Sequence, residues 1–166
     1  MIFIGLISII LIAYLGLIIN LNKKKIPPSL SEGYYILEKK KKHSGVIFTF
    51  VMIAIAVLFL LLSTKYFPDD ALLFLLFLSI FGLLFAGVAS QFKQEVTSSA
   101  HFAGAIMSVI ASSIWVIFRG DFHVFVSILS IYGIISFIDR HNKRLILWIE
   151  LFVFTNTLLQ ITYIIR

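Results

Sequence analysis

The chain has 166 residues and a net charge of +6, and 60% of its residues are hydrophobic while only 13% are charged. Soluble domains carry about 25% charged residues, so this composition excludes an ordinary soluble domain and is typical of a membrane protein. The chain contains no cysteine, which excludes disulfide scaffolds, thiolate metal sites and cysteine nucleophiles.

Six apolar stretches are long enough to cross a bilayer as helices, for which about 17 to 25 residues are needed. They cover residues 2–19, 46–63, 71–89, 98–118, 122–138 and 145–165. We therefore predict an all-α, polytopic transmembrane bundle of six spanning helices that forms a single domain, residues 1–166. The first stretch lacks a preceding basic region and a small-residue cleavage site, so we interpret it as a retained anchor and not as a secretory signal.

The distribution of Lys and Arg predicts how this bundle lies in the membrane, because basic residues concentrate in cytoplasmic loops. Eleven of them fall in the first, third and fifth connections, and three fall on the opposite side. We therefore expect a multi-pass protein of the bacterial inner (cytoplasmic) membrane with both termini outside the cytoplasm.

The one long connection, the cytoplasmic loop 20–45, contains two clusters of lysine. They are Lys23, Lys24 and Lys25, followed by Lys39, Lys40, Lys41 and Lys42. Lysines beside apolar spans are expected to contact anionic lipid headgroups on the cytoplasmic side of the membrane. We therefore expect membrane lipids as partners and do not expect nucleic acid as a partner.

Between the two clusters the sequence predicts a short interfacial helix. Prolines at positions 27–28 stop a helix that leaves the membrane, and Ser29 with Glu32 forms a capping-box pattern. Tyr34 and Tyr35 would then lie at headgroup depth. A solvated linker is the alternative interpretation, since Gly33 weakens the helical pattern.

Small residues recur every fourth position in the third and fourth apolar stretches. They are Gly82 and Ala86 in the third, and Ala100, Gly104, Ser108 and Ser112 in the fourth. Such spacing places small residues on one helix face and predicts close packing of the two helices. The first and second stretches have almost no polar residues, so we expect them to face lipid.

The sixth stretch differs because its polar residues share one side of the helix. At 100° per residue, Glu150, Asn156, Thr157 and Gln160 fall within a sector of about 120°. Lipid cannot satisfy their hydrogen bonds, so they should face the interior of the bundle. Ser127 and Ser130 supply a weakly polar face on the fifth stretch. Together these residues predict a polar interior among the fourth, fifth and sixth helices that binds a lipid, a small ligand or a protein partner, including a second copy of the chain.

Glu150 and His101 are the ionisable residues expected at similar depth inside this interior. Each follows the start of its apolar stretch by a few residues, and both stretches enter from the same side. An ionisable residue in a membrane is a functional candidate, and we name His101 as the expected partner of Glu150. The alternatives are a protonated Glu150, a hydrogen bond to Ser108, Ser130 or a backbone carbonyl, and a side chain that reaches toward Arg144 at the interface.

These observations leave the function open among three classes. The first is a binding protein without catalytic residues, the second is a lipid hydrolase that uses His101 and Glu150, and the third is a carrier in which Glu150 titrates. The histidines lack the spacing of zinc motifs, and phosphate-binding glycine loops are absent, so no metal and no cofactor is expected.

Two segments carry a resemblance to a known family. PPSLSEGYYILEKKKKHSGVIFTF resembles the Pro-x-Ser-x-Ser-x-x-Tyr-Tyr-x-Leu segment before the second helix of a family of small, uncharacterised bacterial and phage-associated membrane proteins. AHFAGAIMSVIASSIWVI is similar to the His-x-x-Gly-Ala-Ile helix of that family. The matching positions are Ser29, Ser31, Tyr34, Tyr35, His101, Gly104 and Ala105. The resemblance implies a multi-helix inner-membrane protein and transfers no activity.

The chain is also distantly similar to seven-helix membrane hydrolases of the alkaline ceramidase and adiponectin-receptor type. Those enzymes hold a zinc ion with three histidines, two of them in a terminal His-x-x-x-His pair. This chain has six expected spans and no such pair.

Overall fold

The computed structural model describes residues 2–23, 25–89, 95–139 and 144–165, of which 95–98 are described by their backbone alone. The described residues form seven helices and no strand, which confirms the all-α class. The helices are α1 (Ile2–Leu21), α2 (Glu32–Lys40), α3 (Val46–Tyr66), α4 (Leu73–Ala89), α5 (Glu95–Arg119), α6 (Phe122–Ile138) and α7 (Leu145–Ile165). The six longer ones coincide with the six apolar stretches, because an apolar segment in lipid pairs its backbone groups only as a helix.

Four of the helices in the described ranges are long and apolar enough to cross a membrane, judged by length and composition. They are α1, α3, α7 and the part of α5 that begins at Ser99. α4 and α6 are also apolar but have 17 residues each. The helices thus indicate a membrane protein, while the crossing of the bilayer by α4 and α6 stays a prediction.

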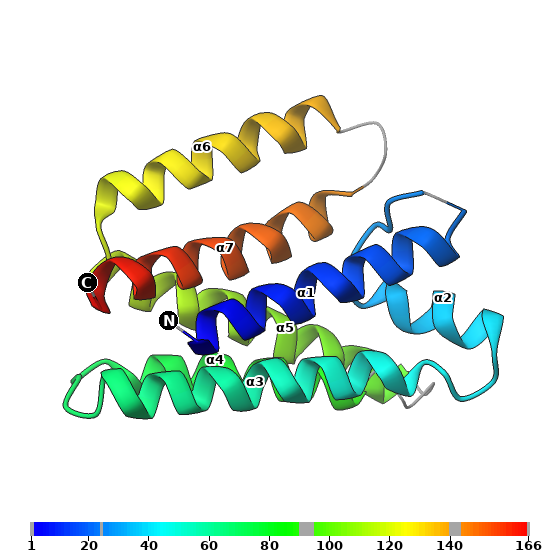
Figure 1. Cartoon of the computed structure of the whole chain (residues 1–166), viewed down its shortest axis with the longest axis horizontal. Helices are drawn as coiled ribbons and strands as arrows, with labels where there is room; N and C mark the ends of the chain where they lie inside the picture. Colours follow the sequence, from blue (N-terminus) through cyan, green and yellow to red (C-terminus); the bar gives the residue numbers. More distant parts are fainter. Residues whose placement is uncertain (1, 24, 90–94, 140–143, 166) are drawn as a thin grey trace.

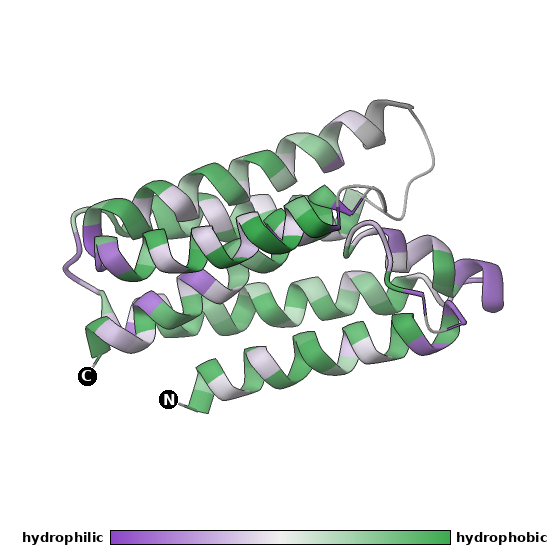
Figure 2. Cartoon of the chain, turned by 90° about the horizontal axis from the view of Figure 1, so that it is seen from above, coloured by the Kyte–Doolittle hydropathy of each residue, from purple (hydrophilic) through white to green (hydrophobic). Residues whose placement is uncertain are grey.

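The six longer helices lie side by side and alternate in direction, so α1 begins and α7 ends at the same end of the bundle (Figure 1). α2 lies at the other end, which we call the α2 end. Hydrophobic residues cover the long helices, and hydrophilic residues gather at the ends of the bundle, most densely on α2 (Figure 2).

α3 is a central helix, so the expectation that the second apolar stretch faces lipid is wrong for its buried side, while Phe50 on another side is 66% exposed. Phe48, Met52 and Ile55 are each at most 2% exposed, because α3 packs against both α1 and α4. The Thr49 hydroxyl donates a hydrogen bond to the Gly87 carbonyl at 2.9 Å, which joins α3 to α4. Apolar side chains in a membrane pack on neighbouring helices as well as on lipid, so the lack of polar residues did not decide which helix lies outside.

The most extensive contact between helices joins α4 and α5, and small residues make it. A Cβ built on Gly82 would lie 2.5 Å from the Gly104 carbonyl oxygen, and one on Gly104 would lie 2.9 Å from the Ala86 nitrogen. The two backbones therefore touch, and the structure brings the small residues of the third and fourth stretches face to face. This close packing fixes α5 beside α4 and positions the cavity described below.

At the end opposite α2, an ion pair joins the turn before α4 to the end of α5. The Asp70 carboxylate accepts hydrogen bonds from Arg119 Nη2 at 2.6 Å, from Arg119 Nε at 2.8 Å and from Trp115 Nε1 at 3.3 Å. Burial raises the pKa of Asp70, but hydrogen bonds from Arg119, the Leu72 N–H and Trp115, together with the charge of Arg119, lower it below its ordinary value of 3.8.

This lowered pKa predicts a contribution to stability that acid removes. The contribution is fully present above the unfolded-state pKa and is lost as the pH falls through the lower folded-state value, hence below about pH 4. Because Arg119 is 43% exposed, we expect Asp70→Asn to lower the free energy of unfolding by only about 1 kcal/mol at pH 7. Thermal unfolding in detergent at pH 7 and pH 3 measures this, and a difference between wild type and variant that is as large at pH 3 as at pH 7 would contradict it.

Candidate functional site

An elongated cavity lies between α3, α4, α5 and α7, and the chain just before α2 contributes to its wall. The cavity has a volume of about 70 Å³ and is partly open to the surroundings. On α5 its lining runs from His101 to Ser112, which corresponds to about 16 Å at 1.5 Å per residue. Ligand pockets typically measure about 300–1,000 Å³, so this cavity is narrow for its length and has room only for a slender ligand.

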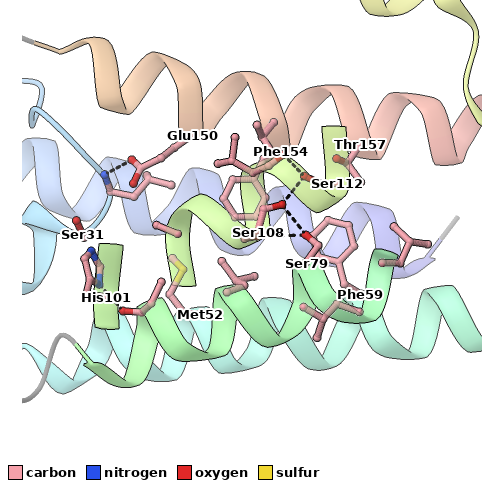
Figure 3. A pocket seen from close by; sticks show the side chains of 18 of the residues that line it. Ser31, Met52, Phe59, Ser79, His101, Ser108, Ser112, Glu150, Phe154 and Thr157 are labelled. Atoms are coloured by element: carbon pink, nitrogen blue, oxygen red, sulfur yellow. Dashed lines mark hydrogen bonds between the residues drawn. The ribbon is translucent and has the colours of Figure 1, made fainter. Parts of the chain in front are cut away.

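Apolar side chains make most of the wall. They come from all four helices and include Met52, Phe59, Ile80, Val109, Val153 and Phe154. Three serines on α4 and α5 lie along the middle of the cavity (Figure 3), but their hydroxyls already have partners. Ser79 and Ser112 both donate to the Ser108 carbonyl, at 3.0 and 2.7 Å. The serines therefore serve the packing of α4 on α5 and leave the middle of the cavity effectively apolar.

Most of the polar groups that remain are at the α2 end of the cavity. Figure 3 shows Ser31, His101 and Glu150 together there, with Thr157 farther along. Glu150 Oε2 accepts a hydrogen bond from the Leu30 N–H at 2.7 Å. His101 Nδ1 lies 2.7 Å from the Ala86 carbonyl oxygen. A carbonyl only accepts, so Nδ1 carries the hydrogen and donates it.

The structure thus brings Glu150 and His101 to the same cavity, from α7 and from α5. The hydrogen bonds described above go to backbone groups of other elements, namely Leu30 before α2 and Ala86 on α4. Nothing in the sequence signalled these partners, because a backbone N–H or C=O has the same form at every residue. The contact of Glu150 with Leu30 depends on the path of the chain around Leu30.

The chain just before α2 folds back over the end of the bundle, and three hydrogen bonds hold it there. The Tyr14 hydroxyl donates to the Leu30 carbonyl at 3.1 Å, the Leu30 N–H donates to Glu150, and the Leu147 N–H donates to the Pro28 carbonyl at 3.0 Å. Leu147 is in the first turn of α7, where N–H groups have no partner inside the helix. Residues 28–30 are therefore tied to α1 and to α7 at once.

α2 begins at Glu32, so the sequence prediction of a helix in the first loop is confirmed, and the linker alternative is not. The Ser29 hydroxyl accepts the Glu32 N–H at 3.1 Å, as a capping residue does, although Ser29 lies outside the helix. A side chain on Gly33 would overlap with the Tyr14 hydroxyl, so this glycine lets α2 approach α1 closely. Of the two tyrosines expected at headgroup depth, Tyr34 is buried and Tyr35 is 46% exposed.

The remaining polar residues of α7 lie in different environments. Thr157 lines the cavity. The Gln160 amide accepts the Asp121 N–H at 2.7 Å and donates to the Asp121 carbonyl at 2.8 Å, so it clamps the turn between α5 and α6. Asn156 is 2% exposed, and its Oδ1 has no hydrogen-bond partner among the described residues.

Ser127 and Ser130 are exposed on α6 and do not reach the cavity. The Ser130 hydroxyl donates to the Val126 carbonyl of its own helix at 2.8 Å. α6 packs mainly on α7, where the hydroxyls of Tyr132 and Thr155 lie 2.9 Å apart. The polar interior therefore forms without α6, which the sequence pattern could not indicate because small polar residues also occur on exposed helix faces.

The lysines of the first loop are exposed at the α2 end. They are Lys23, Lys25, Lys39, Lys40, Lys41 and Lys42, while Lys24 lies outside the described residues. Within the described ranges no three His, Cys, Asp or Glu side chains gather as they would around a metal ion.

The fold indicates a helical membrane protein, and its bundle contains an internal, mainly apolar cavity. The chain matches no protein-family model, no curated protein and no solved structure.

Proposed function

We propose that this chain is a bacterial inner-membrane protein that binds a single-chain amphiphilic lipid in the cavity between α3, α4, α5 and α7. The observation that carries the proposal is the form of the cavity, which is long, apolar along its walls and polar at one end. Its length of about 16 Å is close to half of the ~30 Å hydrocarbon thickness of a bilayer, which is the depth of one leaflet. One acyl chain fits that depth.

The proposed topology is six spans with both termini outside the cytoplasm. At 1.5 Å per residue the 17 residues of α4 and α6 extend about 25 Å, which is close to the hydrocarbon thickness. The alternating direction of the six helices in Figure 1 supports this topology, because each of these two helices joins neighbours that run the opposite way. Six exposed lysines at the α2 end support a cytoplasmic position for that end.

In this orientation the polar end of the cavity lies at the level of the cytoplasmic headgroups, and the apolar part lies at the level of the acyl chains. A lipid from the cytoplasmic leaflet therefore matches the cavity in both parts. Anionic headgroups of the surrounding leaflet are the proposed partners of the exposed lysines, since each lysine near such a surface contributes about 1 kcal/mol of attraction.

Binding without turnover is the proposed activity. Glu150 and His101 hold backbone groups that close the end of the cavity and join the helices around it. These contacts give both residues a structural role in the wall of the cavity. A hydrolase would have to catalyse a reaction in this cavity, and a carrier would have to transport a solute through it. The contacts described above favour neither.

The proposal is tested by filling the cavity. Ala105 lines it, whereas Ala103 on the same helix is exposed on the outside of the bundle. We expect Ala105→Trp to lower the labelling of α5 and α7 by hexadecanol with a photoreactive diazirine in its chain by about tenfold, the equivalent of about 1.4 kcal/mol. Ala103→Trp is the matched control and should leave labelling unchanged. Peptide mass spectrometry after irradiation in phosphatidylethanolamine–phosphatidylglycerol vesicles measures both, and equal labelling of the two variants would contradict the proposal.

A further inference from the structure

We infer that the Phe154 side chain sets the longest apolar chain that the cavity accepts, because it separates the cavity from a second apolar space between α1 and α7. This inference rests on the proposed function, since it specifies the chain of the lipid that binds in the same cavity. A longer chain would need the second space, which the Phe154 ring keeps apart from the cavity.

The second space is a lateral groove between α1 and α7. It is lined by α1 from Ile4 to Ile12 and by α7 from Phe154 to Thr162, which corresponds to about 12 Å along each helix. α1 packs mainly on α2 and α3, and α7 packs mainly on α5 and α6, which leaves the groove between them. Its volume is about 250 Å³, compared with about 70 Å³ for the cavity. The groove therefore has room for a part of an apolar chain that the cavity cannot hold.

The hydroxyls that line the groove already have hydrogen-bond partners. Ser8 and Thr162 each donate to a carbonyl of their own helix, at 3.0 and 2.7 Å. The Thr155 hydroxyl lies 2.9 Å from the Tyr132 hydroxyl. An acyl chain could therefore lie along the groove without breaking a hydrogen bond, so the groove matches the tail of a lipid better than its head group.

Phe154 is the one described residue that lines both spaces. Its ring is half-buried and packs on the ring of Phe59 on α3, with the two centroids 6.3 Å apart. Phe59 is buried and lines the cavity, so α3 supports the Phe154 ring from the cavity side. The ring of Phe154 thus forms the wall between the cavity and the groove.

The end of the cavity farthest from α2 is closed by packed side chains. On α5 the lining ends at Ser112, and Trp115 follows about one turn later and is buried. The Trp115 ring packs on Phe67, with centroids 5.3 Å apart, and its Nε1 donates to Asp70. A chain that pushed these groups aside would disturb the contact of α5 with the turn before α4. A chain too long for the cavity would therefore have to extend sideways, past Phe154.

The test is a competition between two alcohols that differ only in chain length. Photoreactive hexadecanol is added to the purified full chain in phosphatidylethanolamine–phosphatidylglycerol vesicles that contain unlabelled hexadecanol or tetracosanol, whose chain is half as long again. Labelling of α5 and α7 is counted only where Ala105→Trp reduces it. On the wild-type chain, half-maximal competition should need at least about tenfold more tetracosanol than hexadecanol in the vesicles, because the longer chain overpacks the cavity.

Phe154→Ala joins the two spaces and so tests the residue itself. Tetracosanol should then compete within about threefold of hexadecanol, because the end of its chain can enter the groove. Phe81→Ala is the matched control, since Phe81 is exposed on α4 and lines neither space. This control should keep the tenfold difference of the wild-type chain.

A second substitution tests the groove. Ser8 lines the groove from α1 and does not line the cavity, so Ser8→Trp fills the groove and leaves the cavity wall unchanged. In the double variant Phe154→Ala with Ser8→Trp, the tenfold difference between the two alcohols should return. If Phe154→Ala does not fold, Phe154→Leu takes its place, and its shorter side chain should reduce the difference in the same direction.

The outcomes separate this inference from the proposed function. Equal competition by the two alcohols on the wild-type chain, or an unchanged tenfold difference in the Phe154 variant, would overturn the role of Phe154 and leave lipid binding standing. A double variant that behaves like Phe154→Ala would overturn it as well, because the longer chain would then not lie in the groove. If Ala105→Trp does not reduce the labelling by hexadecanol, the proposed function itself fails.

Discussion

Gly82→Val is expected to lower the free energy of unfolding by at least about 2 kcal/mol, at the upper part of the range for overpacked sites. A Cβ at this position would lie 2.5 Å from the Gly104 carbonyl oxygen and 2.6 Å from the Ser108 nitrogen. Both are backbone atoms, so no rotation of a side chain can relieve the overlap. α4 and α5 would have to move apart along their most extensive contact.

The matched control is Gly16→Val on α1. Nothing lies within 4 Å of a Cβ built on Gly16, so the first atom of the added side chain overlaps with no other helix. Thermal unfolding in detergent, followed by tryptophan fluorescence, should show a large decrease in Tm for Gly82→Val and little change for Gly16→Val. Equal shifts would mean that the close approach of α4 and α5 does not limit stability.

Gln160→Leu is expected to lower the free energy of unfolding by about 2–4 kcal/mol, because it leaves two backbone groups unpaired. The Gln160 side chain is 0% exposed, and its amide binds both the N–H and the carbonyl of Asp121. Leucine fills a similar volume but offers neither a donor nor an acceptor. The turn between α5 and α6 would lose its attachment to α7.

Thr162→Val on α7 is the control, because the Thr162 hydroxyl donates only to the Leu158 carbonyl of its own helix at 2.7 Å. That change should stay within about 0.5 kcal/mol, as substitutions without a structural role do. Hydrogen exchange gives a second measurement, and the amide of Asp121 should exchange faster in Gln160→Leu. If Gln160→Leu lowers the Tm but leaves the exchange of the Asp121 amide unchanged, the loss of stability does not come from the turn.

The extent of the helices could be predicted from sequence because one physical requirement determines it. An apolar stretch in a bilayer must satisfy its backbone internally, so residues 122–138 and 145–165 form helices with the bounds that their composition indicates. The same holds for the polar sector of α7, since Asn156, Thr157 and Gln160 are all buried as lipid exclusion requires.

The partners of those polar residues could not be predicted in the same way. Gln160 binds the backbone of Asp121, and Glu150 binds the backbone of Leu30, so both contacts depend on the path of a turn or a loop. The spacing of polar residues predicts which face of its own helix a residue lies on. It does not predict where along that helix a turn or loop from elsewhere in the chain makes contact. Tyr14 shows the same limit, because a tyrosine in an apolar stretch does not reveal that it holds the loop before α2.

The loop before α2 has a consequence for the route by which a ligand reaches the cavity. Tyr14, Glu150 and Leu147 hold residues 28–30 across the α2 end, so a molecule arriving from the aqueous side would have to break several hydrogen bonds together. With the proposed lipid as ligand, the route left is the lateral surface of the bundle, which would face acyl chains. The cavity would then exchange with the bilayer as its reservoir, and its occupancy would follow the mole fraction of the ligand in the leaflet and not its concentration in the aqueous phase.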